Sequence, residues 1–89
     1  MYAVLVNVKI AEGRHAEAIA ALKDHLVPMV KNAPGFVRGT WFGDEHSGNS
    51  LVEFDSEEAA RAMSSQVSAG PDDPVSIEQV HVYEVHAEA

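Results

Sequence analysis

The stretch NAPGFVRGTW, residues 32–41, decides the fold, because it holds both the end of a helix and the start of a strand. Its first half, Asn32 to Gly35, is a helix stop, since Pro and Gly are the strongest breakers of regular local structure. Its second half begins a strand that we expect to run from Phe36 to Phe42. The other elements can be assigned on either side of this junction.

The residues before the junction predict a strand followed by a helix. Apolar side chains alternate with others from Tyr2 to Ile10, and this period of two is typical of a strand. From Arg14 to Lys31 the apolar residues recur at steps of three and four, which marks one face of a helix. That face contains Ile19, Leu22, Leu26 and Met29. Pro28 has no N–H to donate to the carbonyl of Asp24, so we expect a kink there or a short final turn restarting at Pro28.

The residues after the junction predict a hairpin, a second helix and a last strand. A polar connection, Gly43 to Asn49, leads into a strand from Ser50 to Asp55. The second helix is expected to begin at Ser56 as N-cap and to extend to Val67, with a buried stripe that includes Ala60 and Met63. After a loop over residues 69–74, the last strand is expected from Val75 to Val85, followed by a frayed tail.

This βαββαβ order predicts a single ferredoxin-like α+β domain over residues 1–89, with a four-stranded antiparallel sheet and two helices on one face. The other face of the sheet has no cover within one chain. Short domains with much apolar surface often gain stability by oligomerising, so we expect a homodimer formed through the sheet face.

Charge and composition exclude several classes of partner. The net charge is −8, and no Lys or Arg cluster offsets it locally. Phosphate backbones and anionic membranes repel such a surface, so neither nucleic acid nor a membrane is expected as a partner. The chain has no cysteine and no segment typical of a signal peptide or membrane span, so a cytoplasmic location is expected.

Three short segments carry a resemblance to a known family. They are Ala-Val-Leu-Val-Asn-Val in the first strand, Pro34-Gly35-Phe36, and Val52 to Ala60. Through them the chain resembles the dimeric α/β-barrel superfamily that includes the antibiotic-biosynthesis monooxygenase-like proteins. The resemblance implies two sheets packed face to face, with a pocket between sheet and helices or towards the barrel interior.

The resemblance also implies a choice of activities: cofactor-independent oxygenation of polycyclic phenols, haem degradation or lactone isomerisation. Haem-degrading members have an Asn on the first strand, which Asn7 matches. They also need a Trp on a later strand and a His on the second helix. Here the only Trp is Trp41, on the second strand, and the second helix has no His. Haem degradation is therefore not expected, and neither is any other cofactor.

Strand parity brings together a polar group on the sheet face away from the helices. If Val4, Val6 and Val8 face the helices, the opposite face holds Asn7, Glu53, His81 and Tyr83. In a catalytic reading, His81 deprotonates a substrate that Asn7 orients, and Glu53 and Tyr83 help to bind it. In the alternative reading, these side chains hydrogen-bond across the dimer interface.

Trp41 and Arg38 have opposite parity, so they should not share a face. Trp41 is either a stacking partner for a flat aromatic ligand or part of the core or interface. Arg38 either pairs with an acid or lies at a solvated edge. The spacing of the five His residues predicts no metal site, because it contains no metal-binding motif.

Two functions follow from these observations. The first is a small cofactor-independent monooxygenase-like enzyme that acts on a small aromatic compound. The alternative is a non-catalytic ligand-binding or dimerisation domain. The interior distinguishes them, because an enzyme needs an apolar cavity with convergent polar groups, whereas a structural dimer is packed to native density.

Overall fold

The computed structural model describes residues 1–89 and contains four strands and two helical regions, the first of which has three parts. In chain order the elements are β1 (Tyr2–Ile10), α1 (His15–Ala21), η1 (Leu22–Leu26), α2 (Val27–Lys31), β2 (Phe36–Gly43), β3 (Ser47–Phe54), α3 (Glu57–Ser64) and β4 (Val75–Glu84).

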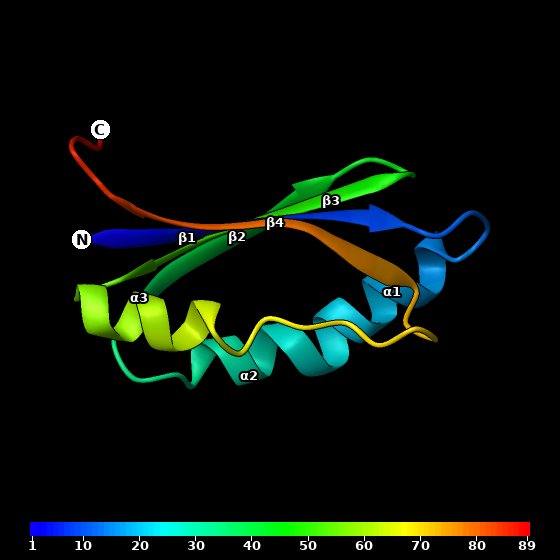
Figure 1. The fold of residues 1–89 in the computed structure, drawn as a ribbon, viewed down its shortest axis with the longest axis horizontal. Helices are drawn as coiled ribbons and strands as arrows, with labels where there is room; N and C mark the ends of the chain where they lie inside the picture. The colour runs from blue at the N-terminus through cyan, green and yellow to red at the C-terminus, as the bar shows by residue number, and fades with distance from the viewer.

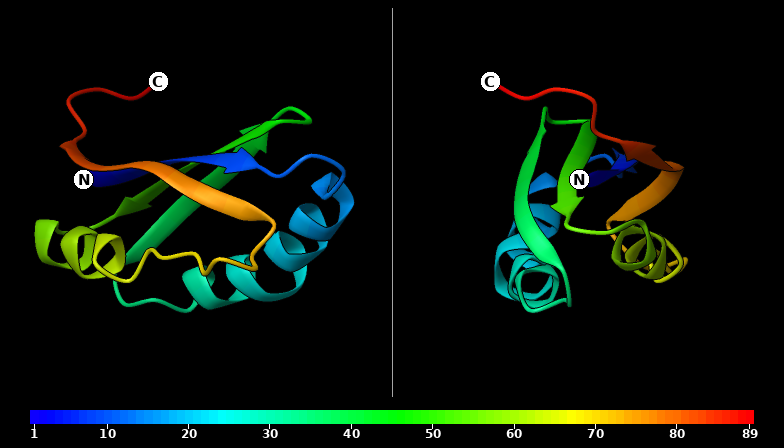
Figure 2. Two further views of the ribbon diagram at one scale, coloured as in Figure 1. Left: turned by 45° about the vertical axis from the view of Figure 1, so that its right-hand side comes forward. Right: turned by 90° about the vertical axis from the view of Figure 1, so that its left-hand side faces the viewer.

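The strands form one antiparallel sheet in the order β2-β3-β1-β4. Both helical regions lie on one side of it (Figure 1), and they run side by side beneath the strands (Figure 2). The predicted ferredoxin-like α+β arrangement is therefore confirmed. The chain after β4 leaves the sheet on the face opposite the helices.

The register confirms the predicted strand faces. Val4 pairs with Val52 and Val82 on the helix side, while Leu5 pairs with Leu51 and His81 on the other side. Two bulges interrupt this order, one at residue 37 in β2 and one at residue 78 in β4. Each inserts one residue, so the faces reverse across it.

The first helical region is interrupted ahead of Pro28, as its sequence predicts. Residues 22–26 form a π-helical turn, and the N–H of Val27 bonds to the carbonyl of Leu22. Pro28 then lies in the first turn of α2, where its missing N–H costs little. The wider π turn thus absorbs the proline without ending the helical region.

The hairpin is tighter than the sequence indicated. We expected a polar connection over residues 43–49, but β3 begins at Ser47. The reason is the Asp44 side chain, whose Oδ1 accepts hydrogen bonds from the N–H groups of His46 and Ser47 at 2.9 and 2.8 Å. This short turn lets the polar residues after it pair with β1 and β2.

The second helix begins as predicted and ends early. Ser56 is the N-cap, and its Oγ accepts a hydrogen bond from the N–H of Ala59 at 3.1 Å. The helix ends at Ser64 instead of Val67, and residues 65–74 form an irregular segment leading to β4. No helix is long and apolar enough to cross a membrane.

The core lies where β1 and β3 meet the helices. Its most buried side chains are Phe54, Ala60, Val4, Val30 and Val52. Phe36, the first residue of β2, meets Phe54 edge to face at 6.4 Å between ring centroids. The junction at residues 32–36 therefore packs directly against the centre of the fold.

Candidate functional site

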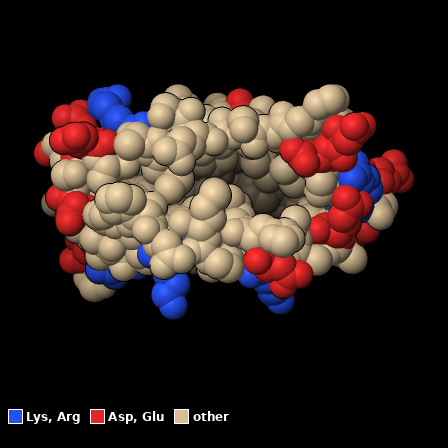
Figure 3. Space-filling model, turned by 90° about the horizontal axis from the view of Figure 1, so that it is seen from below, with Lys and Arg blue, Asp and Glu red and all other residues tan.

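A cavity of about 840 Å³ lies between the sheet and the helices. Its floor is β1, whose period of two turns Val4, Val6 and Val8 towards the helices. Figure 3 views the molecule from the helix side and shows a hollow lined mainly by uncharged side chains. The two layers therefore leave an apolar space between them over much of the sheet.

The first helical region forms one wall of this cavity. Ile19 and Leu22 are half-buried there, but Leu26 and Met29 are 41% and 55% exposed. Leu26 and Met29 belong to the predicted apolar face but are exposed, because the cavity separates their part of the helix from the sheet. Their apolar side chains lie at its mouth.

Trp41 lines the cavity from β2. It pairs with Ser50, which pairs with Val6, so its side chain lies on the helix side. Its ring folds back over Gly39, where an added Cβ would lie 2.6 Å from the Trp41 ring. The ring is only partly buried and packs against the core. Trp41 thus combines core packing with a place in the cavity wall.

One end of the cavity is polar. Asp44, Ser47 and Asp73 line it, together with His15 at the start of α1. Hydrogen bonds from the N–H of His46 and from the hydroxyl and N–H of Ser47 hold the pKa of the Asp44 carboxyl below its ordinary value. Asp44 therefore stays charged at neutral pH.

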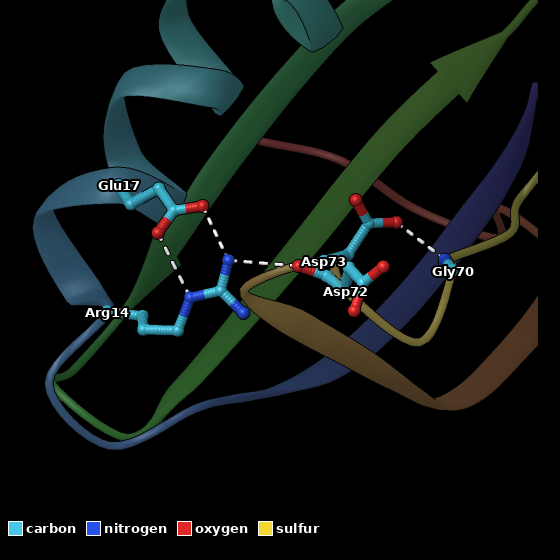
Figure 4. Close-up of polar contacts among 5 residues, drawn as sticks. All are labelled: Arg14, Glu17, Gly70, Asp72 and Asp73. Carbon is cyan, nitrogen blue, oxygen red and sulfur yellow. Dashed lines mark hydrogen bonds and ion pairs between the residues drawn. The ribbon is translucent and has the colours of Figure 1, made fainter.

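Arg14 links two segments of the chain at this end of the cavity (Figure 4). Its guanidinium makes a double hydrogen bond with Glu17, at 3.0 and 2.6 Å, and donates to the carbonyl of Asp72 at 2.9 Å. The bond with Glu17 raises the pKa of Arg14 and lowers that of Glu17. The start of α1 is thereby linked to the segment that precedes β4.

The polar group predicted from strand parity lies on the other side of the sheet, as expected, and therefore outside this cavity. Asn7 donates to Asn49 Oδ1 on the neighbouring strand. His81 stacks on Tyr83 with ring centroids 5.7 Å apart. Neither His81 nor Tyr83 has a hydrogen bond to Glu53 within the chain. The catalytic roles of Asn7 and His81 stay a prediction about the interior of a dimer.

Glu53 has a charged partner within the chain. It is only 7% exposed, and its Oε2 lies 2.9 Å from Arg38 Nε. The N–H is not directed at that oxygen, so the ion pair leaves Oε2 without a hydrogen bond. Arg38 also lies 3.5 Å from Glu88 in the C-terminal tail. Arg38 is exposed, as predicted for an edge residue, but it compensates a buried charge.

Sequence reasoning missed the cavity's own ionisable residues. Four line it: His15, His25, Asp44 and Asp73. The helical pattern identified the apolar face of the first helical region, but it gave no sign that an unfilled space lies beside that face. No three His, Asp or Glu side chains come close enough to hold a metal ion.

Comparison with known proteins supports the fold. An asparagine-to-alanine variant of SnoaB, a cofactor-independent oxygenase from Streptomyces nogalater, is 17% identical, with a TM-score of 0.73 over 98% of this chain and 95% of that one. An arginine-to-serine variant of MhuD, with two manganese protoporphyrin IX molecules bound per active site, is 16% identical, with a TM-score of 0.70 over 100% of this chain and 98% of that one. No family model and no curated protein matches the chain.

The architecture defines a ferredoxin-like α+β fold with an apolar cavity between its two layers. SnoaB and MhuD share this fold over nearly the whole length of each chain. The resemblance seen in the three sequence segments is confirmed at this level. At these identities the likeness concerns fold alone, and function must be argued from the site.

Proposed function

We propose that this protein binds a small, flat, largely apolar compound in the cavity between its sheet and helices. The observation that carries the proposal is the cavity itself, which has Trp41 in its wall and polar groups at one end. Its volume of about 840 Å³ is within the usual range for small-molecule sites, roughly 300–1,000 Å³. A domain this small gains most from filling its core, so an unfilled core supports a ligand-binding role.

Trp41 is the side chain best placed to recognise an aromatic ring. Its indole is partly exposed to the cavity, and its position is fixed by packing over Gly39 and against the core. A rigid aromatic wall stacks on a flat ligand with little loss of conformational entropy. The predicted aromatic ligand therefore has a specific contact.

The only Trp of the chain also reports on ligand binding. A flat polycyclic phenol that absorbs at the wavelength of indole emission should quench Trp41 fluorescence to saturation. Val6→Phe should weaken this quenching because it fills the cavity floor. Val37→Phe adds the same volume outside the cavity and should leave quenching unchanged. Equal quenching in all three proteins, with circular dichroism showing each one folded, would contradict the cavity as the binding site.

Cofactor-independent oxygenation is the second candidate, and the fold shared with the oxygenase SnoaB favours it. A phenol that has lost a proton can give electrons directly to oxygen. One oxygen atom then forms a carbonyl at a ring carbon, and the other leaves as water with two hydrogens, one from that carbon and one from the phenol hydroxyl. The protein has to supply a base and a site that holds the anion.

Two sets of residues compete for the role of base. His15 and His25 line the cavity, whereas His81 and Asn7 lie on the opposite side of the sheet. Oxygen uptake with the same phenol, in the presence of a chelator, separates them. Loss of uptake in His81→Ala supports the predicted dimer-interior site, and loss in His15→Ala places the chemistry in the cavity. If the wild type takes up no oxygen, non-catalytic ligand binding is the function that remains.

We also propose that two copies form a homodimer through the sheet face away from the helices. Phe42, Leu51 and Tyr83 are 54%, 40% and 50% exposed, and the register places all three on that face. An apolar patch of this kind on a sheet is typical of a protein interface. The proposed interface also covers the predicted polar group of Asn7, Glu53, His81 and Tyr83.

Light scattering after gel filtration tests the dimer. Leu51→Glu places a charge in the centre of the proposed interface and should give a monomer at micromolar concentration. Met29→Glu is the matched control, because Met29 is similarly exposed but lies on the helix side. If Leu51→Glu has the same mass as the wild type, the sheet face is not the interface.

A further inference from the structure

The ionisable side chains that line the cavity are acids and imidazoles. The four ionisable side chains that line it are two aspartates, Asp44 and Asp73, and two histidines, His15 and His25. No Lys or Arg lines it. At a pH where imidazole is neutral, the fixed charges of the lining are both negative.

The two carboxylates lie at the same end. The N–H of Ile10 donates to the carbonyl of His46, and the N–H of Ala11 donates to the carbonyl of Pro74, at 2.8 Å each. The end of β1 is therefore held between the turn that contains Asp44 and the segment that contains Asp73. The other end of β1 lies beneath the apolar core. Charge is thus confined to one end of an otherwise apolar space.

Each carboxylate has an oxygen that is not used within the chain. Asp44 Oδ1 accepts three hydrogen bonds, from the N–H of His46 and from the N–H and hydroxyl of Ser47. Asp73 Oδ2 accepts from the N–H of Gly70. The second oxygen of each group has no hydrogen bond to the protein. These oxygens can accept hydrogen bonds from a ligand while the first oxygens hold the loops in place.

Arg14 interacts electrostatically with Asp73, but it has a carboxylate partner of its own. Arg14 lies at the same end, but its guanidinium is paired with Glu17 and bonded to the carbonyl of Asp72 (Figure 4). Arg14 and Glu17 together are neutral. The two aspartates therefore determine the sign of the potential that a ligand meets at this end.

We infer that the cavity selects flat compounds with a positively charged amine, placing the ring against Trp41 and the ammonium group beside Asp44 and Asp73. This inference rests on the proposed ligand-binding function and names its substrate class. Trp41 and Asp44 are three residues apart in extended chain, about 10 Å. A two-ring aromatic with a short alkyl arm spans that length. A carboxylate on the same arm meets two like charges, and no Lys or Arg lines the cavity to pair with it.

The test uses three matched probes: a naphthyl ring with a butyl arm that ends in an ammonium, a hydroxyl or a carboxylate. Their affinities are measured by calorimetry at pH 8, above the reference imidazole pKa of about 6.5. Because Asp44 and Asp73 are both exposed, two ion pairs with them predict that the ammonium probe binds only about five-fold tighter than the hydroxyl probe. The carboxylate probe should bind most weakly.

Asp44→Asn with Asp73→Asn supplies the decisive variant. Asn keeps an acceptor oxygen for the loop hydrogen bonds but removes both charges. The preference for ammonium over carboxylate should fall by about five-fold or more, while the hydroxyl probe should bind as before. Glu58→Gln with Glu78→Gln is the control, since it changes the net charge equally at exposed positions outside the cavity.

The outcomes distinguish a failure of the charge preference from a failure of the proposed ligand-binding function. If all three probes bind equally, or the carboxylate binds tightest, the charge preference is wrong and the cavity remains a ligand site. If Glu58→Gln with Glu78→Gln lowers the preference for ammonium equally, the inference is also overturned, because the net charge of the whole protein would then explain the effect. If no probe binds and none displaces the phenol that quenches Trp41, the proposed binding function itself is wrong.

Discussion

Gly35 is a position where a single methyl group should destabilise this fold strongly. Its φ is +81°, a left-handed conformation that side chains rarely adopt. A Cβ added there would lie 2.7 Å from both Ala59 Cβ and Asp55 Oδ1. The exposed Asp55 carboxylate can move aside, but Ala59 is held by the first turn of α3. Gly35→Ala therefore combines backbone strain with a steric clash.

The size of the effect follows from these two parts. The left-handed φ costs an L-residue about 1–2 kcal/mol, and overpacking against a helix costs about 1–3 kcal/mol more. A chain of this length has a total unfolding free energy of about 4–13 kcal/mol. Gly35→Ala should therefore remove about 2–5 kcal/mol, which lowers the melting temperature by at least about 10 °C.

Urea unfolding followed by circular dichroism, at one fixed protein concentration, measures this loss. Gly13→Ala is a matched control, because Gly13 has a φ of +76° but no atom within 4 Å of an added Cβ. Gly13→Ala should show the stability loss from backbone strain alone. Combining Ala59→Gly with Gly35→Ala should recover part of the additional stability lost in Gly35→Ala. The reasoning is refuted if Gly35→Ala loses no more stability than Gly13→Ala.

Three further predictions concern polar contacts. The pKa of the Asp44 carboxyl is lowered in the folded state, so Asp44 should stabilise the fold above the reference Asp pKa of about 3.9 and lose that contribution as the pH falls. The urea midpoint of Asp44→Asn should therefore drop less on acidification than that of the wild type. Arg38→Met leaves the buried Glu53 carboxylate unpaired and should lower the unfolding free energy by about 1–3 kcal/mol. Adding Glu53→Gln should restore part of this loss, and an unchanged unfolding free energy in Arg38→Met would contradict the pairing. Ser56→Ala removes the N-cap of α3 and should cost about 1 kcal/mol in urea unfolding, whereas Ser68→Ala should cost nothing measurable.

Much of the fold was predictable because its signals are local. Alternation gave β1 its observed limits, the capping role of Ser56 was identified from residue type and position, and the helix stop near Gly35 was correct. Errors fell where a distant or side-chain contact decided the outcome. The early start of β3 depends on the hydrogen bonds of Asp44, which residue type alone does not reveal.

The candidate site was less predictable, because it depends on space between elements. Parity correctly placed Asn7 and His81 on the face away from the helices, but the cavity lies on the other face. The bulge at residue 78 turns Val75 and Ile77 into the cavity, although simple alternation groups them with Gln79. Sequence periodicity has no means of showing where such an insertion falls.

The sequence by itself determined the order of the elements, the faces of β1 and β3 and the start of α3 after Ser56. These properties depend on backbone preferences and on periods of two and about 3.6 residues, which neighbouring residues encode. The tertiary structure decided that the layers leave an open cavity, that Trp41 lines it and that Arg38 compensates Glu53. Those features depend on distances between residues far apart in the chain, which are fixed only when the layers pack together.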